Sequence, residues 1–318
     1  MPSDTRAKSV ISRKTSKRRG AVLLMTLLLI TILSGGIALL ISHSDHLLRL
    51  SQRPLGDAQT GKIAGDLKRL LPTLLSKIDS ARTLEYALIL PLSSRSEDGR
   101  FALEASLRSP LGRFNINNVC DPSGTPRKPY DAFLPALFAR YPIASPEVFI
   151  NIVYDTIDTD LAERQPGSEI VTFFSDFHNG SIEDKHQFNQ IVARYLALTK
   201  DPQVLQVPWD RVIGFEGEKI DINYASSEVV SLIVPEIDAN TLSSITEMRT
   251  EPFEGKEKLT SLAPALSPHY DAWFTTYKAG SSYPLVGEVT MRRNGEESMF
   301  VFHVDAKTRI LNRLEIVQ

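Results

Sequence analysis

The chain has 318 residues, of which 42% are hydrophobic and 23% are charged. This is the composition of a globular protein with a sizeable core, and it excludes wholesale disorder. The first 20 residues hold seven basic side chains and one acidic side chain, whereas the remainder holds 29 basic and 37 acidic side chains. Because an acidic body repels a phosphate backbone, we expect no nucleic-acid partner.

An uncharged run of 21 residues, 21–41, follows the basic leader directly. A helix of that length spans about 30 Å, which is the thickness of the hydrocarbon core of a membrane. Cleaved secretory signals have a shorter apolar region of about 7–15 residues. We therefore predict a single retained transmembrane helix, with residues 1–20 in the cytoplasm and the acidic body across the membrane.

After the apolar run, the sequence changes its period twice. Residues 42–85 carry apolar side chains at three- and four-residue steps, broken by Pro54 and Pro72, which predicts more than one helix. Residues 100–107 alternate between apolar and polar side chains, which predicts a strand.

A long stretch, 118–278, shows helical periodicity, and strand-like sequence returns after it. Three strands are predicted at 283–291, 299–305 and 309–317, joined by turns at 294–295 and 305–307. Strand-forming sequence thus brackets a helical insert of about 160 residues.

Catalytic chemistry has no recognisable signature in the sequence. The six histidines form no H-E-x-x-H or other compact metal-ligand spacing. No G-x-S-x-G elbow occurs. Cys120 is the single cysteine, and we interpret it as a buried structural thiol rather than a nucleophile. We therefore predict that the protein is not an enzyme.

Acidic residues are concentrated in one part of the helical stretch. They are Asp155, Asp158, Asp160, Glu163, Glu169, Asp176, Glu183 and Asp184. Calcium takes six to eight oxygen ligands of this kind. The spacing is not that of an EF-hand, because Ala162 and Glu163 stand where a third Asp or Asn and then a glycine are needed. A calcium site and a solvated helix end are both compatible with this pattern.

Residues 220–262 have the pattern of a helix-hairpin-helix module. In DNA-binding modules the hairpin is rich in glycine, so that its amides face phosphate. Here Pro235 removes an amide donor, and Glu236 and Asp238 add negative charge. We therefore interpret the module as structural. A membrane-anchored protein that binds DNA during uptake is the alternative function.

Four features occur together in chain order. They are Gly20 at the end of the basic leader, Gly112-Arg-Phe-Asn-Ile-Asn-Asn118, Ile157-Asp-Thr-Asp160 and Lys219-Ile-Asp-Ile-Asn223-Tyr-Ala-Ser. In that order they resemble the general secretion pathway protein K (GspK) family, the large minor pseudopilins of the type II secretion system. The resemblance runs from about residue 18 to the C-terminus.

The resemblance implies an α+β, pilin-like fold. A long N-terminal transmembrane helix packs on a small antiparallel sheet, and a large α-helical domain containing the helix-hairpin-helix-like module is inserted between strands. The implied parts are a prepilin-type leader (1–20), a transmembrane helix (21–41), the first part of the body (42–117), the insert (118–278) and C-terminal body strands (279–318).

The resemblance also implies a function and partners. The protein would sit at the tip of a periplasmic pseudopilus, anchored in the inner membrane, and help to start its assembly and the export of folded proteins across the outer membrane. Its partners would be other minor pseudopilins and the prepilin peptidase, which cuts after Gly20 and leaves Ala21 as the first residue. Calcium would be the bound ion, with Asp158, Asp160 and Glu169 as the carried-over ligands.

One position departs from the usual pilin pattern. Most such proteins carry a glutamate five residues into the mature chain, and this chain carries Met25. A carboxylate buried in lipid costs several kcal/mol unless it is paired, and in a fibre the amine of the neighbouring subunit above would pair it. We interpret an apolar Met25 as a feature of a topmost subunit, which has no neighbour above.

Overall fold

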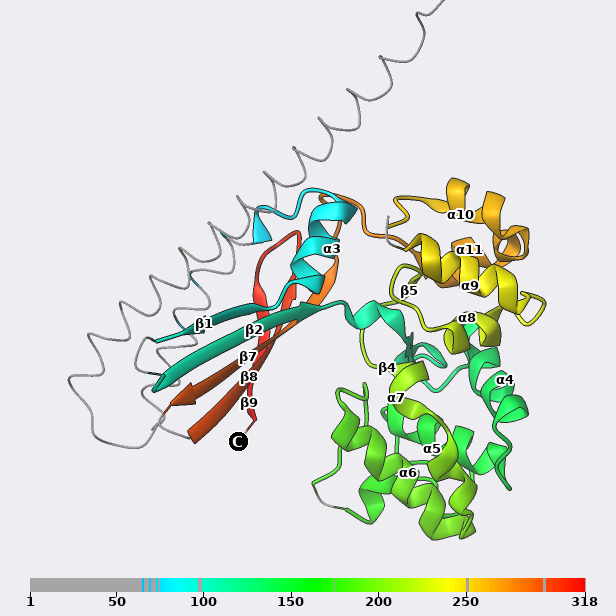
Figure 1. The fold of residues 1–318 in the computed structure, drawn as a ribbon. Coiled ribbons are helices and arrows are strands. Elements are labelled where there is room, and N and C mark those ends of the chain that lie inside the picture. The colour runs from blue at the N-terminus through cyan, green and yellow to red at the C-terminus, as the bar shows by residue number, and fades with distance from the viewer. Residues whose placement is uncertain are drawn as a thin grey trace, which may run out of the picture.

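The computed structural model describes residues 75–317, with gaps at 97–98, 175, 250–251 and 294–295, together with residues 65, 69 and 73. Figure 1 shows two lobes, a twisted sheet and a larger group of helices beside it. Gly20, Ala21, Met25 and the predicted membrane helix lie outside the described residues. Within the described part of the chain, no helix is long and apolar enough to span a membrane.

The smaller lobe is a five-stranded antiparallel sheet in the order β1-β2-β7-β8-β9. Its strands are β1 Leu92–Arg95, β2 Phe101–Arg108, β7 Pro284–Arg293, β8 Glu296–Asp305 and β9 Leu311–Val317. Strands β2 and β7 are direct neighbours, with Ala105 opposite Val289. The chain therefore leaves the sheet after β2, builds the helical lobe, and returns on the adjacent strand.

The four longer strands lie where alternating apolar residues predict them. The strand predicted at 100–107 is β2, and the three predicted C-terminal strands are β7, β8 and β9. Strand β1 was not predicted, because its sequence, LSSR, has a single large apolar residue and no alternation. The predicted turn at 294–295 lies in one of the gaps.

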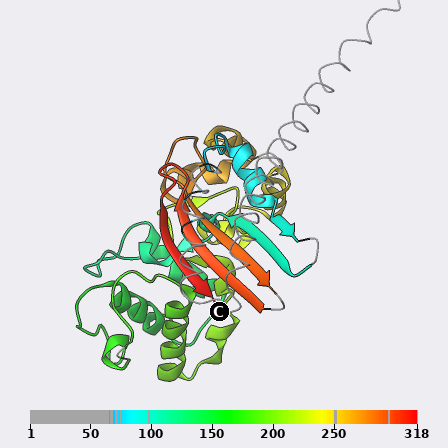
Figure 2. The same cartoon turned by 90° about the vertical axis from the view of Figure 1, so that its left-hand side faces the viewer.

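Helix α3 (Ala81–Ile89) begins at a capping box in which Ser80 Oγ accepts the Thr83 amide at 3.2 Å and Thr83 Oγ1 accepts the Ser80 amide at 2.9 Å. It contacts β2 and buries Ala81 and Leu84. The sheet lobe has its own apolar core, to which Leu84 and Phe300 belong. Figure 2 shows the strands from the side opposite the helical lobe.

Gly287 lies in the middle of β7, opposite Phe302 of β8. A Cβ atom at this position would overlap the ring of Phe302, which is only 3% exposed. The absence of a side chain therefore lets the ring lie directly on the β7 backbone.

We expect Gly287→Ala to lower the free energy of unfolding by about 1–3 kcal/mol, because the buried ring has to move. Urea unfolding of the variant would measure this loss. Phe302→Leu makes room for the methyl group, so the loss in the double variant should be smaller than the sum of the two single losses. Additive losses would contradict the overlap.

The larger lobe is the helical insert. Its helices are α4 Phe133–Arg140, α5 Pro146–Ile157, α6 Lys185–Thr199, α7 Trp209–Val212, α8 Ser227–Ile233, α9 Ala239–Met248, α10 Lys256–Leu262 and α11 Ser267–Trp273. Short 3-10 turns are η1 Pro110–Gly112, η2 Ile116–Asn118, η3 Tyr130–Ala132, η4 Ile170–Thr172, η5 Pro202–Gln206 and η6 Pro264–Leu266. Two parallel strand pairs join distant segments: β3 Phe114–Asn115 with β4 Ile213–Gly214, and β5 Ile220–Asp221 with β6 Phe274–Thr275.

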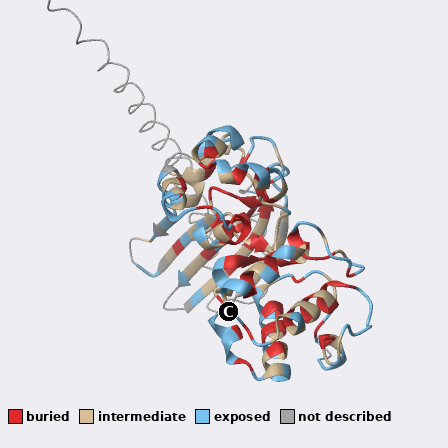
Figure 3. Cartoon of the chain, turned by 90° about the vertical axis from the view of Figure 1, so that its right-hand side faces the viewer, coloured by how far each residue is buried: buried red, intermediate tan, exposed pale blue. Residues whose placement is uncertain are grey.

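The insert has a second apolar core, separate from that of the sheet, and aromatic rings fill much of it. Phe149 of α5 stacks on Trp209 of α7, with ring centroids 5.0 Å apart, and Phe114 stacks on Phe133 at 4.0 Å. Figure 3 shows the buried residues on the inner sides of the helices and where the two lobes meet. The apolar stripes predicted for α5 and α6 face this core, as the buried Ile152 and Ile191 show.

Candidate functional site

The first glycine-asparagine motif, 112–118, forms the passage from the sheet into the insert. A Cβ atom on Gly112 would lie 2.5 Å from the carbonyl oxygen of Tyr224, so the two backbones are in direct contact. Asn115 Nδ2 donates to the Gly217 carbonyl at 2.8 Å, and Asn118 Nδ2 donates to the Glu218 carbonyl at 3.0 Å. The motif therefore provides the partners for the backbone of the segment that precedes the second motif.

The second motif, 219–226, lies at the same junction between the sheet and the insert, and two of its residues form hydrogen bonds there. Asn223 accepts the Phe253 amide at 2.7 Å and donates to the Phe253 carbonyl at 3.1 Å, so one amide satisfies both backbone groups of a buried residue. Asp221 accepts the hydroxyl of Tyr283 at 2.8 Å, and Tyr283 also hydrogen-bonds Ser109 at 2.7 Å. This chain of side chains joins β5 of the insert to residues at the ends of β2 and β7.

The carboxyl group of Asp221 is fully buried at this junction. It is 0% exposed, and burial raises its pKa from 3.8 to about 6 even though the Asn223 amide and Tyr283 hydrogen-bond to it. The junction therefore contains one group that changes its charge in a mildly acidic range.

Three further contacts between side chains join the two lobes. The Tyr224 hydroxyl lies 3.0 Å from Glu85 Oε2 of α3, His303 of β8 pairs with Glu216, and Arg313 Nη1 of β9 lies 3.1 Å from Glu183 Oε2. The Arg313–Glu183 pair is exposed, so it adds little stability.

The acidic residues predicted to hold calcium lie in different settings. Asp158 follows α5 and is 0% exposed, Glu169 precedes η4 and is 0% exposed, whereas Asp160 is exposed and its Oδ1 accepts the Ala162 amide at 2.8 Å. The structure thus brings two of the three predicted ligands inside and leaves the carboxylate of the third at the surface.

Asn179 joins this cluster, and the sequence pattern did not single it out. Its Nδ2 donates to Glu169 Oε1 at 2.7 Å and to the Asp160 carbonyl at 3.0 Å. Among the described residues, no group of three His, Cys, Asp or Glu side chains is arranged to hold a metal ion. The candidate oxygens here come instead from two carboxylates and an amide.

Three oxygens of this cluster are buried without a hydrogen-bond partner: Asp158 Oδ1, Glu169 Oε2 and Asn179 Oδ1. Burial raises the pKa of both carboxyl groups, and for Glu169 repulsion from Asp155, Asp158 and Asp160 adds to the effect. Buried oxygens are nearly always paired, and carboxylate and amide oxygens are the ligands that calcium prefers. The donor types of this cluster are therefore those of a calcium ligand set.

The helix-hairpin-helix-like pattern corresponds to α8, the hairpin 234–238 and α9. Asp238 caps α9 by accepting the Thr241 amide at 2.9 Å, and Glu236 Oε1 lies 3.1 Å from His269 Nε2. The pKa of Glu236 is lowered by a hydrogen bond from its own backbone amide and then by His269, and the pKa of Asp238 is lowered by hydrogen bonds from the Thr241 hydroxyl and amide. The hairpin therefore presents two carboxylates at the position where a DNA-binding hairpin presents bare amides.

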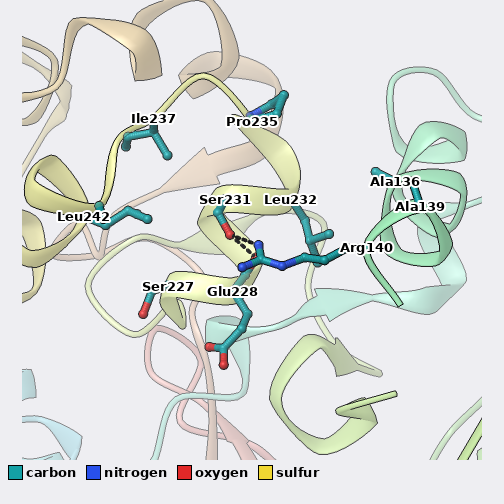
Figure 4. Close-up of a pocket in the computed structure, with 11 residues that line it drawn as sticks. Ala136, Ala139, Arg140, Ser227, Glu228, Ser231, Leu232, Pro235, Ile237 and Leu242 are labelled. Carbon is teal, nitrogen blue, oxygen red and sulfur yellow. Dashed lines mark hydrogen bonds between the residues drawn. The ribbon is translucent and has the colours of Figure 1, made fainter. Parts of the chain in front are cut away.

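A groove of about 800 Å³ lies between this module and α4 (Figure 4). Apolar side chains form much of its wall, and Arg140 hydrogen-bonds Ser231 across it. Glu228, at the same end, pairs with Arg211 at 2.7 Å. The groove is lined by Ala136, Ala139, Arg140, Ser227, Glu228, Ser231, Leu232, Pro235, Ile237, Ala239 and Leu242.

The fold and its junction define an α+β protein in which a small antiparallel sheet carries a large helical insert between two adjacent strands. A solved structure has a similar fold: a chain from the GspK–GspI–GspJ complex of the type 2 secretion system of enterotoxigenic Escherichia coli. The match covers 83% of this chain and 100% of that chain, with a TM-score of 0.51 and 12% sequence identity. The protein has a GspK-like fold. No protein-family model and no curated sequence matches the chain.

Proposed function

We propose that this protein is a minor pseudopilin at the tip of a type II secretion pseudopilus, where it helps to start assembly and the export of folded proteins across the outer membrane. One observation carries the proposal: the sheet is interrupted between β2 and β7 by a helical insert, in a chain whose fold is GspK-like. The solved neighbour is part of a complex with two further chains, GspI and GspJ. We infer that this chain, too, works in a hetero-complex with other minor pseudopilins.

The sequence supports a location for this function. The basic leader and the uncharged run 21–41 support a single inner-membrane helix, with the N-terminus in the cytoplasm and the body in the periplasm. Cleavage after Gly20 by a prepilin peptidase would leave Ala21 with a free amine. Met25 would then suit a topmost subunit, because it leaves no buried carboxylate unpaired.

Calcium is part of the proposal as a structural ion. Asp158, Glu169 and Asn179 would hold it through the oxygens that lack partners. A bound divalent cation would supply the positive charge that the buried carboxylates need. Its expected effect is on the stability of the insert, since binding to the folded state alone stabilises that state.

Co-purification tests the partner proposal. The tagged full-length chain would be extracted from membranes after co-expression with candidate small minor pseudopilins from the same host. We expect a stable complex of defined stoichiometry by size-exclusion chromatography with light scattering. Labelling of overproduced pseudopili with antibody should mark one end only. A chain that stays alone, or labelling along the shaft, would contradict the tip function.

The same preparation separates this function from DNA uptake. We expect no shift of duplex DNA in a gel at physiological salt, because the body is acidic and the hairpin carries Glu236 and Asp238. Micromolar binding that weakens with added salt would favour the alternative.

A further inference from the structure

Three carboxylates are fully buried in one place in the insert, and one guanidinium lies among them. Asp155, Asp158 and Glu169 are each 0% exposed. Arg164 Nη1 lies 2.6 Å from Asp155 Oδ1 and 2.5 Å from Asp158 Oδ2. With all three carboxyl groups ionised, the cluster carries a charge of −3, and Arg164 reduces it to −2. Uncompensated buried charge of this size is costly, and a bound divalent cation would neutralise it.

Arg164 pairs with Asp155 and with one oxygen of Asp158, and other oxygens of the cluster have no hydrogen-bond partner. Asp155 is saturated: its Oδ1 accepts Arg164 Nη1, and its Oδ2 accepts the Arg164 amide at 3.0 Å and the hydroxyl of Ser168. By contrast, Asp158 Oδ1 and Glu169 Oε2 have no partner, and neither does Asn179 Oδ1. The guanidinium therefore leaves three buried oxygens of the cluster without a partner, two of them carboxylate oxygens.

The guanidinium is fixed in this position by its other contacts. Arg164 Nη2 donates to the Gly124 carbonyl at 3.0 Å, and its planar group lies over the ring of Tyr154 at 5.6 Å. Gly124 has a φ of +73°, and a Cβ atom there would overlap Arg164 and lie 2.8 Å from Asp158 Oδ2. The neighbouring loop is therefore shaped to admit an arginine at this point.

We propose that Arg164 is a built-in cation that neutralises Asp155 and one oxygen of Asp158, so that the insert folds without calcium and offers a single divalent-cation position to Asp158 Oδ1, Glu169 Oε2 and Asn179 Oδ1. This inference rests on the calcium part of the proposed function. Arg164 is a positioning residue: it sets how much charge the metal has to neutralise, and it touches one of the ligands.

Thermal unfolding of the full-length protein in detergent tests the proposal, in chelator and at millimolar calcium. We expect the wild type to unfold cooperatively in chelator and to gain melting temperature with calcium. Arg164→Gln should lose about 6–12 °C in chelator, because it leaves buried carboxylates uncompensated, and should gain more from calcium than the wild type does. Arg164→Lys keeps the charge but cannot make all the contacts of the guanidinium, so its loss in chelator should be smaller than that of Arg164→Gln.

Arg194→Gln is the matched control, since Arg194 donates to the Gly167 carbonyl at 2.7 Å and covers the ring of Phe173. It should leave the calcium gain unchanged. Equal gains in the wild type and Arg164→Gln, or no loss for Arg164→Gln in chelator, would overturn the role of Arg164. A gain in Arg164→Gln alone would mean that the guanidinium occupies the metal position, which also overturns it. No gain in any variant would refute the calcium proposal, while co-purification would still decide the pseudopilin proposal.

Discussion

Replacing Asp221 by asparagine is expected to abolish a pH-dependent loss of stability of about 3 kcal/mol in the wild-type protein. Burial raises the pKa of this carboxyl group from 3.8 to about 6 in the folded state. Between these two values the folded state holds the proton and the unfolded state does not. The contribution of Asp221 is therefore fully favourable below pH 3.8, declines as the pH rises to about 6, and stays low above it.

The asparagine variant can keep two of the hydrogen bonds that Asp221 makes. Its side-chain oxygen can accept the Asn223 amide, and its NH₂ group can donate to the Tyr283 hydroxyl, which can donate to Ser109. Denaturant unfolding from pH 4 to pH 7.5 at fixed calcium would measure the free energy of both proteins. We expect the difference between Asp221→Asn and the wild type to grow in favour of the variant across this range.

Asp210→Asn is the control, because the side chain of Asp210 is 69% exposed and pairs with Lys185 at the surface. It should leave the pH profile of the wild type unchanged. A wild-type profile parallel to that of Asp221→Asn would show that the buried carboxyl group does not govern this range.

The second large effect is expected at Asn223. Replacing it by alanine leaves the amide and the carbonyl of Phe253 buried without partners, because the Asn223 side chain serves both. Each unsatisfied group costs about 1–3 kcal/mol, so we expect a loss of about 2–6 kcal/mol. The urea midpoint should fall with little change in the slope of the transition.

Two variants bracket this result. Asn223→Asp keeps an acceptor for the Phe253 amide, but it turns an acceptor oxygen toward the Phe253 carbonyl and adds a second carboxyl group beside the buried Asp221. Its loss should therefore be at least as large as that of Asn223→Ala. Asn240 is exposed on α9, and Asn240→Ala should change the free energy of unfolding by about 0.5 kcal/mol or less. A loss at Asn223 no larger than at Asn240 would show that the junction does not depend on this amide.

Local periodicity predicted most of the secondary structure, because a strand or a helix needs only the side chains of its own segment to show which face is buried. The alternation in β2 and the stripe on α5 are examples. The strand order could not be predicted in this way, since the pairing of Ala105 with Val289 joins segments far apart in the chain.

The candidate calcium site shows the same division. Asp158 and Glu169 were singled out by the family resemblance, within a segment rich in acidic residues, whereas the amide of Asn179 and the guanidinium of Arg164 enter the site only through the tertiary fold. The asparagines of the 112–118 motif could be recognised as a sequence pattern. Their hydrogen bonds to the backbone carbonyls of residues 217 and 218 are seen only in the structure.

The return of the chain from β2 to its neighbour β7 has a consequence for the order of folding. In an unfolded chain, closing the loop of about 175 residues between them would cost about 4–5 kcal/mol of entropy. A folded insert removes most of that cost, because it holds its two ends together: the hydroxyl oxygens of Ser109 and Tyr283 are then 2.7 Å apart. We therefore expect the insert to fold first and to act as the template on which the sheet closes. During synthesis, β1 and β2 leave the ribosome early. The edge of β2 that pairs with β7 therefore stays unpaired until the C-terminal strands have been synthesised.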